Sequence, residues 1–167
     1  IEPQDIIKDR GADILRLWSA MVNYQEDVRL SEEMLQRLGE SYRKIRNTWR
    51  FMLGVLADFD PARDAVAAGS YAETDRYILS RLQEVKARVL QAYRDFEYHA
   101  VFHTLFNFFT NDLSAFYLNF QKDNLYCNRP DDPRRRACQG AVFLLLRETL
   151  LLLAPVLSFT AEEAWGF

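Results

Sequence analysis

Apolar residues recur every three or four positions along most of the chain, which is the spacing of α-helices with one buried face. No stretch alternates apolar and polar residues long enough to require a β-strand. This pattern predicts helices at about 3–10, 13–21, 31–57, 74–95, 98–120 and 134–153, with a last one near the C-terminal end. The predicted fold class is all-α, an antiparallel helical bundle.

Local signals place several helix boundaries. Ser31 is a predicted N-cap because acidic residues follow it, where carboxylates favour the positive end of a helix. Thr160 and Glu163 have the spacing of a capping box for the last helix. The segment 58–70 is rich in proline, glycine and acids and is a predicted loop, in which Asp58 and Asp60 serve as turn and cap residues.

The predicted helix 31–57 carries a polar stripe. Arg43, Arg46, Asn47 and Arg50 stand at i, i+3, i+4 and i+7, so they share one face, which we call the cationic ridge. No acid lies between positions 41 and 57, although the chain has a net charge of −3. Guanidinium groups beside an amide suit phosphate oxygens and base edges. The alternative is a solvated helix face without a partner.

The predicted helix 98–120 carries a row of apolar residues, most of them aromatic. We expect this row to be core and not a base-stacking surface, because its members align on the apolar stripe. Its members are Phe102, Leu105, Phe106, Phe109, Leu113, Phe116, Tyr117 and Phe120.

Residues for chemistry are scarce. His99 and His103 have the i, i+4 spacing of a metal pair, but no third ligand accompanies them, so we interpret them as structural and assign no metal site. Cys127 has an arginine two residues further on but no nearby residue placed as its base. The sequence contains no glycine-rich phosphate loop and no Gly-x-Ser-x-Gly element. We therefore assign no catalytic residue.

The composition fits a core-forming protein of 167 residues, 49% of them hydrophobic. The longest apolar run, 141–146, is far shorter than a bilayer requires. Two cysteines are too few for a disulfide scaffold or a zinc knuckle, so we expect a soluble protein of the reducing cytoplasm. The first residue is Ile1, and the last helix signal starts close to the end, so we expect a piece of a longer protein, truncated at its C-terminal end.

Several stretches resemble isoleucyl-tRNA synthetase, in that family's order and over nearly the whole chain. They include Gly-Ala-Asp-Ile-Leu-Arg-Leu-Trp at 11–18 and Tyr-Arg-Lys-Ile-Arg-Asn-Thr-Trp-Arg-Phe at 42–51. The others lie at 27–31, 58–61, 112–117, 122–127 and 152–165. Asp-Val-Arg-Leu-Ser followed by Arg-Lys-Ile-Arg-Asn-Thr is typical of the isoleucyl family, whereas the 11–18 and 152–165 stretches are shared by related synthetases. Val55, Ser158 and Ala164 depart from the family's usual residues.

The resemblance implies the helical anticodon-binding domain of an enzyme that attaches isoleucine to its tRNA with ATP. The family's His-Ile-Gly-His and Lys-Met-Ser-Lys-Ser elements are absent from this sequence, so the fragment is not expected to catalyse alone. The implied partners are the anticodon stem-loop of isoleucine tRNA and the rest of the synthetase chain, with neither DNA nor a membrane. No cofactor is expected in the fragment, whereas ATP and Mg are implied for the full enzyme, with zinc possible in a missing extension. We divide the chain into a connector, 1–30, and the helical-bundle anticodon-binding domain, 31–167.

The resemblance also implies where tRNA binds. The cationic ridge aligns with the stripe that related synthetases turn toward the anticodon, and a second group follows the aromatic helix. The predicted helix at 134 opens with Arg134, Arg135 and Arg136, where cations are unfavourable to the helix dipole. We therefore expect an anion from outside the chain for this run, with a solvated charge run as the alternative. The predicted tRNA-binding residues are Arg43, Arg46, Asn47, Arg50, Lys122, Asn124, Arg129, Arg134 and Arg135. Two alternatives stay open: a sister synthetase for valine or methionine, and a helical module that binds protein.

Overall fold

The computed structural model describes residues 2–25 and 30–167, and its regular elements in these residues are all helical, as the apolar period predicts. Most of the Asp-Val-Arg-Leu-Ser stretch at 27–31 lies outside the described residues. The elements are α1 (Pro3–Arg10), α2 (Ala12–Met21), α3 (Glu32–Val55), α4 (Pro61–Asp64), η1 (Ala68–Ser70), α5 (Glu73–Arg94), α6 (Tyr98–Asn107), η2 (Phe108–Leu118), α7 (Lys122–Cys127), α8 (Pro133–Leu153) and α9 (Ser158–Trp165).

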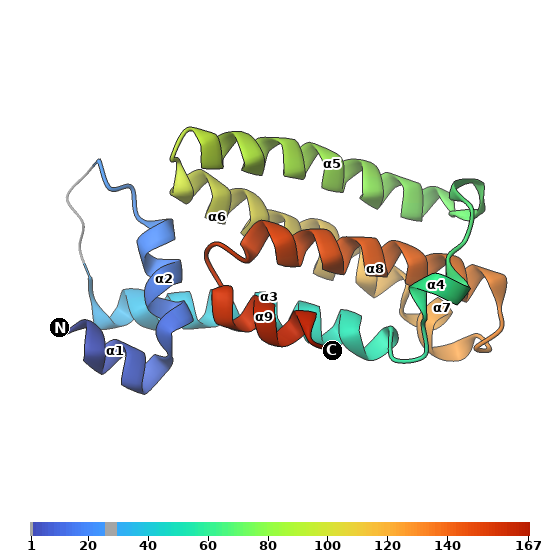
Figure 1. Cartoon of the computed structure of the whole chain (residues 1–167), viewed down its shortest axis with the longest axis horizontal. Helices are drawn as coiled ribbons and strands as arrows, with labels where there is room; N and C mark the ends of the chain where they lie inside the picture. The colour runs from blue at the N-terminus through green and yellow to red at the C-terminus, as the bar shows by residue number, and fades with distance from the viewer. Residues whose placement is uncertain (1, 26–29) are drawn as a thin grey trace.

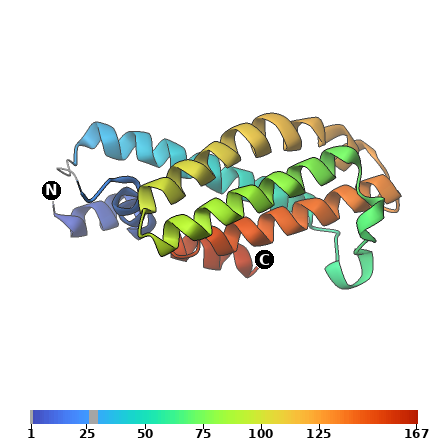
Figure 2. The same cartoon turned by 90° about the horizontal axis from the view of Figure 1, so that it is seen from above.

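The long helices α3, α5 and α8, together with α6 and its continuation η2, run along the long axis of a bundle (Figures 1 and 2). α5 packs on α6 and α8, while α3 packs on α8, η2 and α9. α1 and α2 lie at one end of the bundle, and α4 and α7 lie at the other (Figure 1). The predicted helical bundle is confirmed.

One core joins these helices. Trp49 of α3 is 1% exposed, its ring meets Phe109 of η2 edge-on at 5.8 Å, and its Nε1 donates to Thr149 Oγ1 of α8 at 3.0 Å. α2 adds Ile14 and Leu17 to the same core. The first helices therefore pack on the bundle, and the domain boundary at residue 30 stays a prediction.

The predicted helix 98–120 changes character halfway. From Phe108 to Leu118 it is a π-helix, in which each backbone N–H bonds to the carbonyl five residues back. Phe102, Phe109 and Tyr117 are buried as expected, but Phe116 is 44% exposed and Phe120 is 64% exposed. The prediction of a wholly buried aromatic row is wrong for these last two, because the wider turn moves positions around the helix relative to an α-helical count.

Two capping predictions have different outcomes. Ser31 caps α3, since its Oγ accepts a hydrogen bond from Met34 N at 3.2 Å. Thr160 does not begin α9, which starts two residues earlier at Ser158. A carboxylate from another helix caps it instead: Asp13 Oδ2 accepts from Thr160 N at 2.8 Å and from its Oγ1 at 2.6 Å. The local sequence contains no sign of this distant cap.

The segment 58–70 is not wholly loop, because it contains α4 and η1. Asp60 caps α4 as predicted, accepting from Ala62 N at 2.9 Å. Asp58 is no simple turn residue, since it accepts hydrogen bonds from the distant helix α8. Its partners belong to the site described next.

Candidate nucleic-acid interface

The cationic ridge lies on the outer face of α3. Arg43, Arg46, Asn47 and Arg50 are all exposed, while Ile45 and Trp49 between them are buried. Arg46 Nη2 lies 4.0 Å from a carboxylate oxygen of Glu163 on α9. Within residues 2–25 and 30–167, no carboxylate lies within ion-pair distance of Arg43 or Arg50. The predicted geometry of the ridge is confirmed, and Arg43 and Arg50 have no ion pair with another described residue.

A first groove flanks the ridge between α3 and η2 and has a volume of about 510 Å³. Asn47 lines it from α3, and Lys122 closes it from the start of α7. The structure therefore brings together members of the two predicted tRNA-binding groups. Thr48 Oγ1 and Ser114 Oγ meet at 2.9 Å in its lining. Among the described residues that line it, the polar groups are amides, hydroxyls or ammonium groups, and none is an acid.

Lys44 is a groove residue that the predicted site lacked. It lines the first groove, and its Nζ lies 5.7 Å from the centre of the Phe106 ring, within cation–π distance. Its position one residue after Arg43 placed it beside the stripe and not on it. Helical spacing alone could not assign Lys44 to the groove, because the groove exists only where η2 packs beside α3.

A second groove, of about 640 Å³, lies on the other flank of the ridge, between α3 and α9. Arg46 and Arg50 line it, and its walls include Leu53, Phe59 and Phe167. The acid in its lining is Glu163. The ridge thus separates two different surfaces: Asn47 lines a groove with no acid among its described lining residues, and Arg46 and Arg50 border one that contains Glu163.

The second predicted group is less uniform than the ridge. Lys122 is exposed and donates to Asn119 Oδ1 at 3.2 Å. Arg129 has an 85% exposed side chain and pairs with Asp131 at 3.2 Å. Asn124 is half-buried, and its amide bonds to Gln121, Asn128 and the backbone oxygen of Arg134.

The arginine run that opens α8 divides into two kinds. Arg134 is exposed. Arg135 has a 12% exposed side chain that forms two hydrogen bonds to Asp58, at 2.7 and 3.0 Å, and one to the backbone oxygen of Leu125 at 3.1 Å. Arg136 donates to the backbone oxygen of Asp58 at 2.8 Å. The expectation that the anion for this run comes from outside the chain is wrong for Arg135 and Arg136. Asp58 pairs with Arg135 at 2.7 Å, and carboxylate oxygens of Asp58 and Asp64 each lie 3.5 Å from Arg136.

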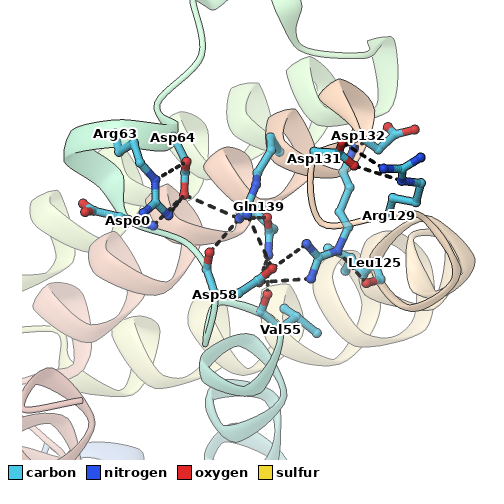
Figure 3. A network of polar contacts seen from close by, with 12 residues as sticks. Val55, Asp58, Asp60, Arg63, Asp64, Leu125, Arg129, Asp131, Asp132 and Gln139 are labelled. Carbon is cyan, nitrogen blue, oxygen red and sulfur yellow. Dashed lines mark hydrogen bonds and ion pairs between the residues drawn. The ribbon is translucent and has the colours of Figure 1, made fainter.

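Figure 3 shows this network joining the end of α3 to α4 and α8. Gln139 of α8 donates to the last carbonyl of α3, that of Val55, at 2.7 Å and to Asp58 Oδ1 at 2.8 Å. The hydrogen bond from Arg135 is the main reason that the pKa of Asp58 falls from 3.8 to about 2. The hydrogen bond from Arg63 likewise lowers the pKa of Asp64. The network therefore holds the C-terminal end of α3 in place. It also binds Arg135 and Arg136 to groups within the protein.

The histidines and cysteines take separate places. His103 is exposed and not packed in the core, whereas His99 is half-buried. Burial raises the pKa of the Cys138 thiol to about 12, and Cys127 is exposed. The described residues contain no group of three His, Cys, Asp or Glu side chains that is placed to hold a metal ion. No helix in the same residues is long and apolar enough to cross a membrane.

The fold and the ridge define a helical-bundle domain with a cationic surface between two grooves. Residues 75–167, more than half of the chain, match the family described as the anticodon-binding domain of tRNA ligase. The chain belongs to this family. The match begins within α5 and extends through α9, so the ridge on α3 lies outside it.

Similar proteins extend the comparison to the whole chain. An isoleucine–tRNA ligase of Desulforudis audaxviator is 51% identical over 166 residues, or 99% of this chain. Those of Brevibacillus brevis and Syntrophotalea carbinolica are 49% and 47% identical over 167 residues. The chain spans 18% of the length of each of these relatives. The residues of the ridge are therefore inside the aligned region even though they precede the family match.

Proposed function

We propose that this chain is the anticodon-binding part of an isoleucine–tRNA ligase and that the ridge of α3 holds the anticodon stem-loop of isoleucine tRNA. The observation that carries the proposal is a pair of exposed guanidinium groups, Arg43 and Arg50, that have no ion pair with a described residue on a protein of net charge −3. Family membership and the names of relatives that align over the whole chain support it. We assign the ATP-dependent attachment of isoleucine to parts of the longer protein outside these residues.

The two flanks of the ridge have different tasks in this proposal. Guanidinium groups contact phosphates whatever the base sequence, so Arg43, Arg46 and Arg50 supply affinity. The amide of Asn47 can donate and accept at once, and it lines a groove with no acid among its described lining residues, so it is suited to a base edge. Bases of single-stranded loops are free to enter such a groove, unlike bases stacked in a helix.

The arginines of α8 also have different tasks. Arg134 and Arg129 are exposed and belong to the proposed tRNA surface, together with Lys122. Arg135 serves the protein, since its guanidinium group already binds Asp58 and Leu125. Asn124 is bonded on both sides, so its contribution to binding is indirect.

The test is charge reversal on the ridge. Arg50→Glu should weaken binding of the isoleucine anticodon stem-loop by more than about tenfold and make its salt dependence shallower. The matched control is Arg88→Glu, since Arg88 is exposed on α5, which packs on α6, η2 and α8 and away from α3. Both variants change the net charge equally. Equal losses for both would mean that general charge, and not the ridge, drives binding, and unchanged binding by Arg50→Glu would refute the proposal.

A further inference from the structure

A buried carboxylate lies at the start of a row of polar side chains that leads to α7. Asp75 of α5 is 1% exposed. Its Oδ1 accepts hydrogen bonds from the Tyr117 hydroxyl at 2.8 Å and from Gln121 Nε2 at 3.0 Å. Its Oδ2 accepts from Ala72 N at 3.1 Å. Donors therefore surround the carboxylate, and it acts as an acceptor at both oxygens.

The carboxylate sets the direction of the amides that follow. Because a carboxylate accepts only, Gln121 has to turn its NH₂ group toward Asp75 and its carbonyl oxygen away. That oxygen accepts from Asn124 Nδ2 at 3.2 Å, and Asn124 Oδ1 in turn accepts from Asn128 Nδ2 at 2.7 Å. Each amide in the row Gln121, Asn124 and Asn128, which we call the amide row, thus has the same direction.

The end of the amide row is at the surface. Asn128 is half-exposed, follows the last residue of α7 and precedes the exposed Arg129. Its NH₂ group faces Asn124, so its Oδ1 is turned away and accepts no hydrogen bond from another described residue. Asn124 has no such free group, because its second N–H bonds to the backbone oxygen of Arg134 at 3.4 Å.

We propose that Asp75 is a positioning residue for tRNA binding and that it acts through the amide row to make Asn128 a hydrogen-bond acceptor toward the anticodon stem-loop. This inference rests on the function proposed above. The group that Asn128 accepts from is an N–H of a loop base or a ribose hydroxyl, the two kinds of donor that a single-stranded RNA loop offers. Neither Asp75 nor Gln121 touches the RNA.

The test measures binding of the isoleucine anticodon stem-loop to the full-length protein. Asp75→Asn keeps the size of the side chain but allows it to donate, so the amide row loses the acceptor that fixes its direction at Gln121. The long bond of 3.4 Å from Asn124 to the backbone oxygen of Arg134 then remains as a restraint on the direction of Asn124. We expect Asp75→Asn to weaken binding roughly five- to tenfold and Asn128→Ala to do the same, because each removes about one hydrogen bond. The double variant should bind no more weakly than either single variant, since both act on the same contact.

Tyr117→Phe is the matched control. It removes a hydrogen bond from the same oxygen of Asp75 but leaves the amide row intact, so its affinity should stay within about twofold of the unsubstituted protein. Thermal unfolding verifies that all variants fold. A stem-loop with 2′-deoxyribose in its loop identifies the donor. If its binding no longer responds to Asn128→Ala, the donor is a ribose hydroxyl, and a persistent response assigns a base.

Three results would overturn the inference: unchanged affinity in Asp75→Asn, equal losses in Asp75→Asn and Tyr117→Phe, or additive losses in the double variant. If Arg50→Glu weakens binding while Asp75→Asn does not, this inference fails and the proposed function stands. If the unsubstituted protein binds the isoleucine stem-loop no better than an unrelated hairpin, both fail.

Discussion

Neighbouring arginines at the start of α8 offer a direct test of which cations the fold itself uses. Arg135→Met should destabilise the chain, whereas Arg134→Met should not. Methionine retains much of the aliphatic stem, so the change removes mainly the guanidinium contacts. Arg135 loses two hydrogen bonds to Asp58 and one to Leu125, while Arg134 is exposed and has no ion pair among the described residues.

The size of the effect follows from the exposure of the pair. Hydrogen bonds to charged groups contribute about 1.5–3 kcal/mol each. The Asp58 side chain is 41% exposed, so solvent screens the pair, and Gln139 and Arg136 remain bonded to Asp58. We therefore expect Arg135→Met to lower the free energy of unfolding by about 1.5 kcal/mol and Arg134→Met to change it by less than about 0.5 kcal/mol.

The pH dependence gives the same experiment a second readout. The pKa of Asp58 in the folded chain is about 2, below its ordinary value of 3.8. A lowered pKa means that ionised Asp58 stabilises the fold above pH 3.8 and loses this contribution as the pH falls toward 2. After solvent screening the contribution is about 1 kcal/mol. Because Arg135 is the largest cause of the lowered pKa, the difference between Arg135→Met and the unsubstituted chain should shrink over this range.

Urea-induced unfolding at pH 7 and pH 3 measures both quantities. The reasoning is refuted if Arg134→Met and Arg135→Met destabilise equally at pH 7. It is also refuted if the cost of Arg135→Met is the same at both values of pH. The two variants should have the opposite order of effects on tRNA binding. Arg134→Met should weaken stem-loop binding more than Arg135→Met, when binding is measured under conditions in which both variants are folded.

Two further predictions concern the fold. Thr149→Val keeps the shape of the side chain but removes the acceptor that lies 3.0 Å from Trp49 Nε1. The buried N–H is then unpaired, so urea-induced unfolding should show a loss of about 1–3 kcal/mol, and no measurable loss would contradict the role given to this hydrogen bond. Phe96 follows the end of α5, is 61% exposed and has a φ of 59°, a conformation that favours glycine. Phe96→Gly should therefore raise the free energy of unfolding by about 0.5 kcal/mol or more. A lower melting temperature would show that the ring contact of Phe96 with Tyr98 contributes more than the relieved backbone strain.

The helices and the ridge were predictable because their signals are local. The spacing of Arg43, Arg46, Asn47 and Arg50 fixes their common face once the segment is helical, whatever packs on the other side. The N-cap at Ser31 is equally local, since its partner is three residues away.

Features that depend on distant partners were not predictable. Asp58 and Arg135 are 77 residues apart, and Asp13 caps a helix 147 residues further along, so nothing near either carboxylate reveals its role. The π-helix at 108–118 also escaped prediction, because its apolar residues fit an α-helical period over a short window. The two grooves depend on which helices lie beside α3. The ridge therefore appeared in the sequence as one surface, although its residues border two.

Selective binding of anticodon stem-loops tests the central claim most directly. The measurement compares stem-loops of isoleucine, valine and methionine tRNA at several salt concentrations, with the unsubstituted protein, Asn47→Ala and Arg46→Ala. Asn47→Ala should reduce the preference for the isoleucine anticodon by roughly ten- to a hundredfold with little change in salt dependence, because a bidentate base contact provides about 1–3 kcal/mol of discrimination. Arg46→Ala should weaken all three alike and make the salt dependence shallower. If Asn47→Ala weakens all three equally, the ridge does not read the anticodon.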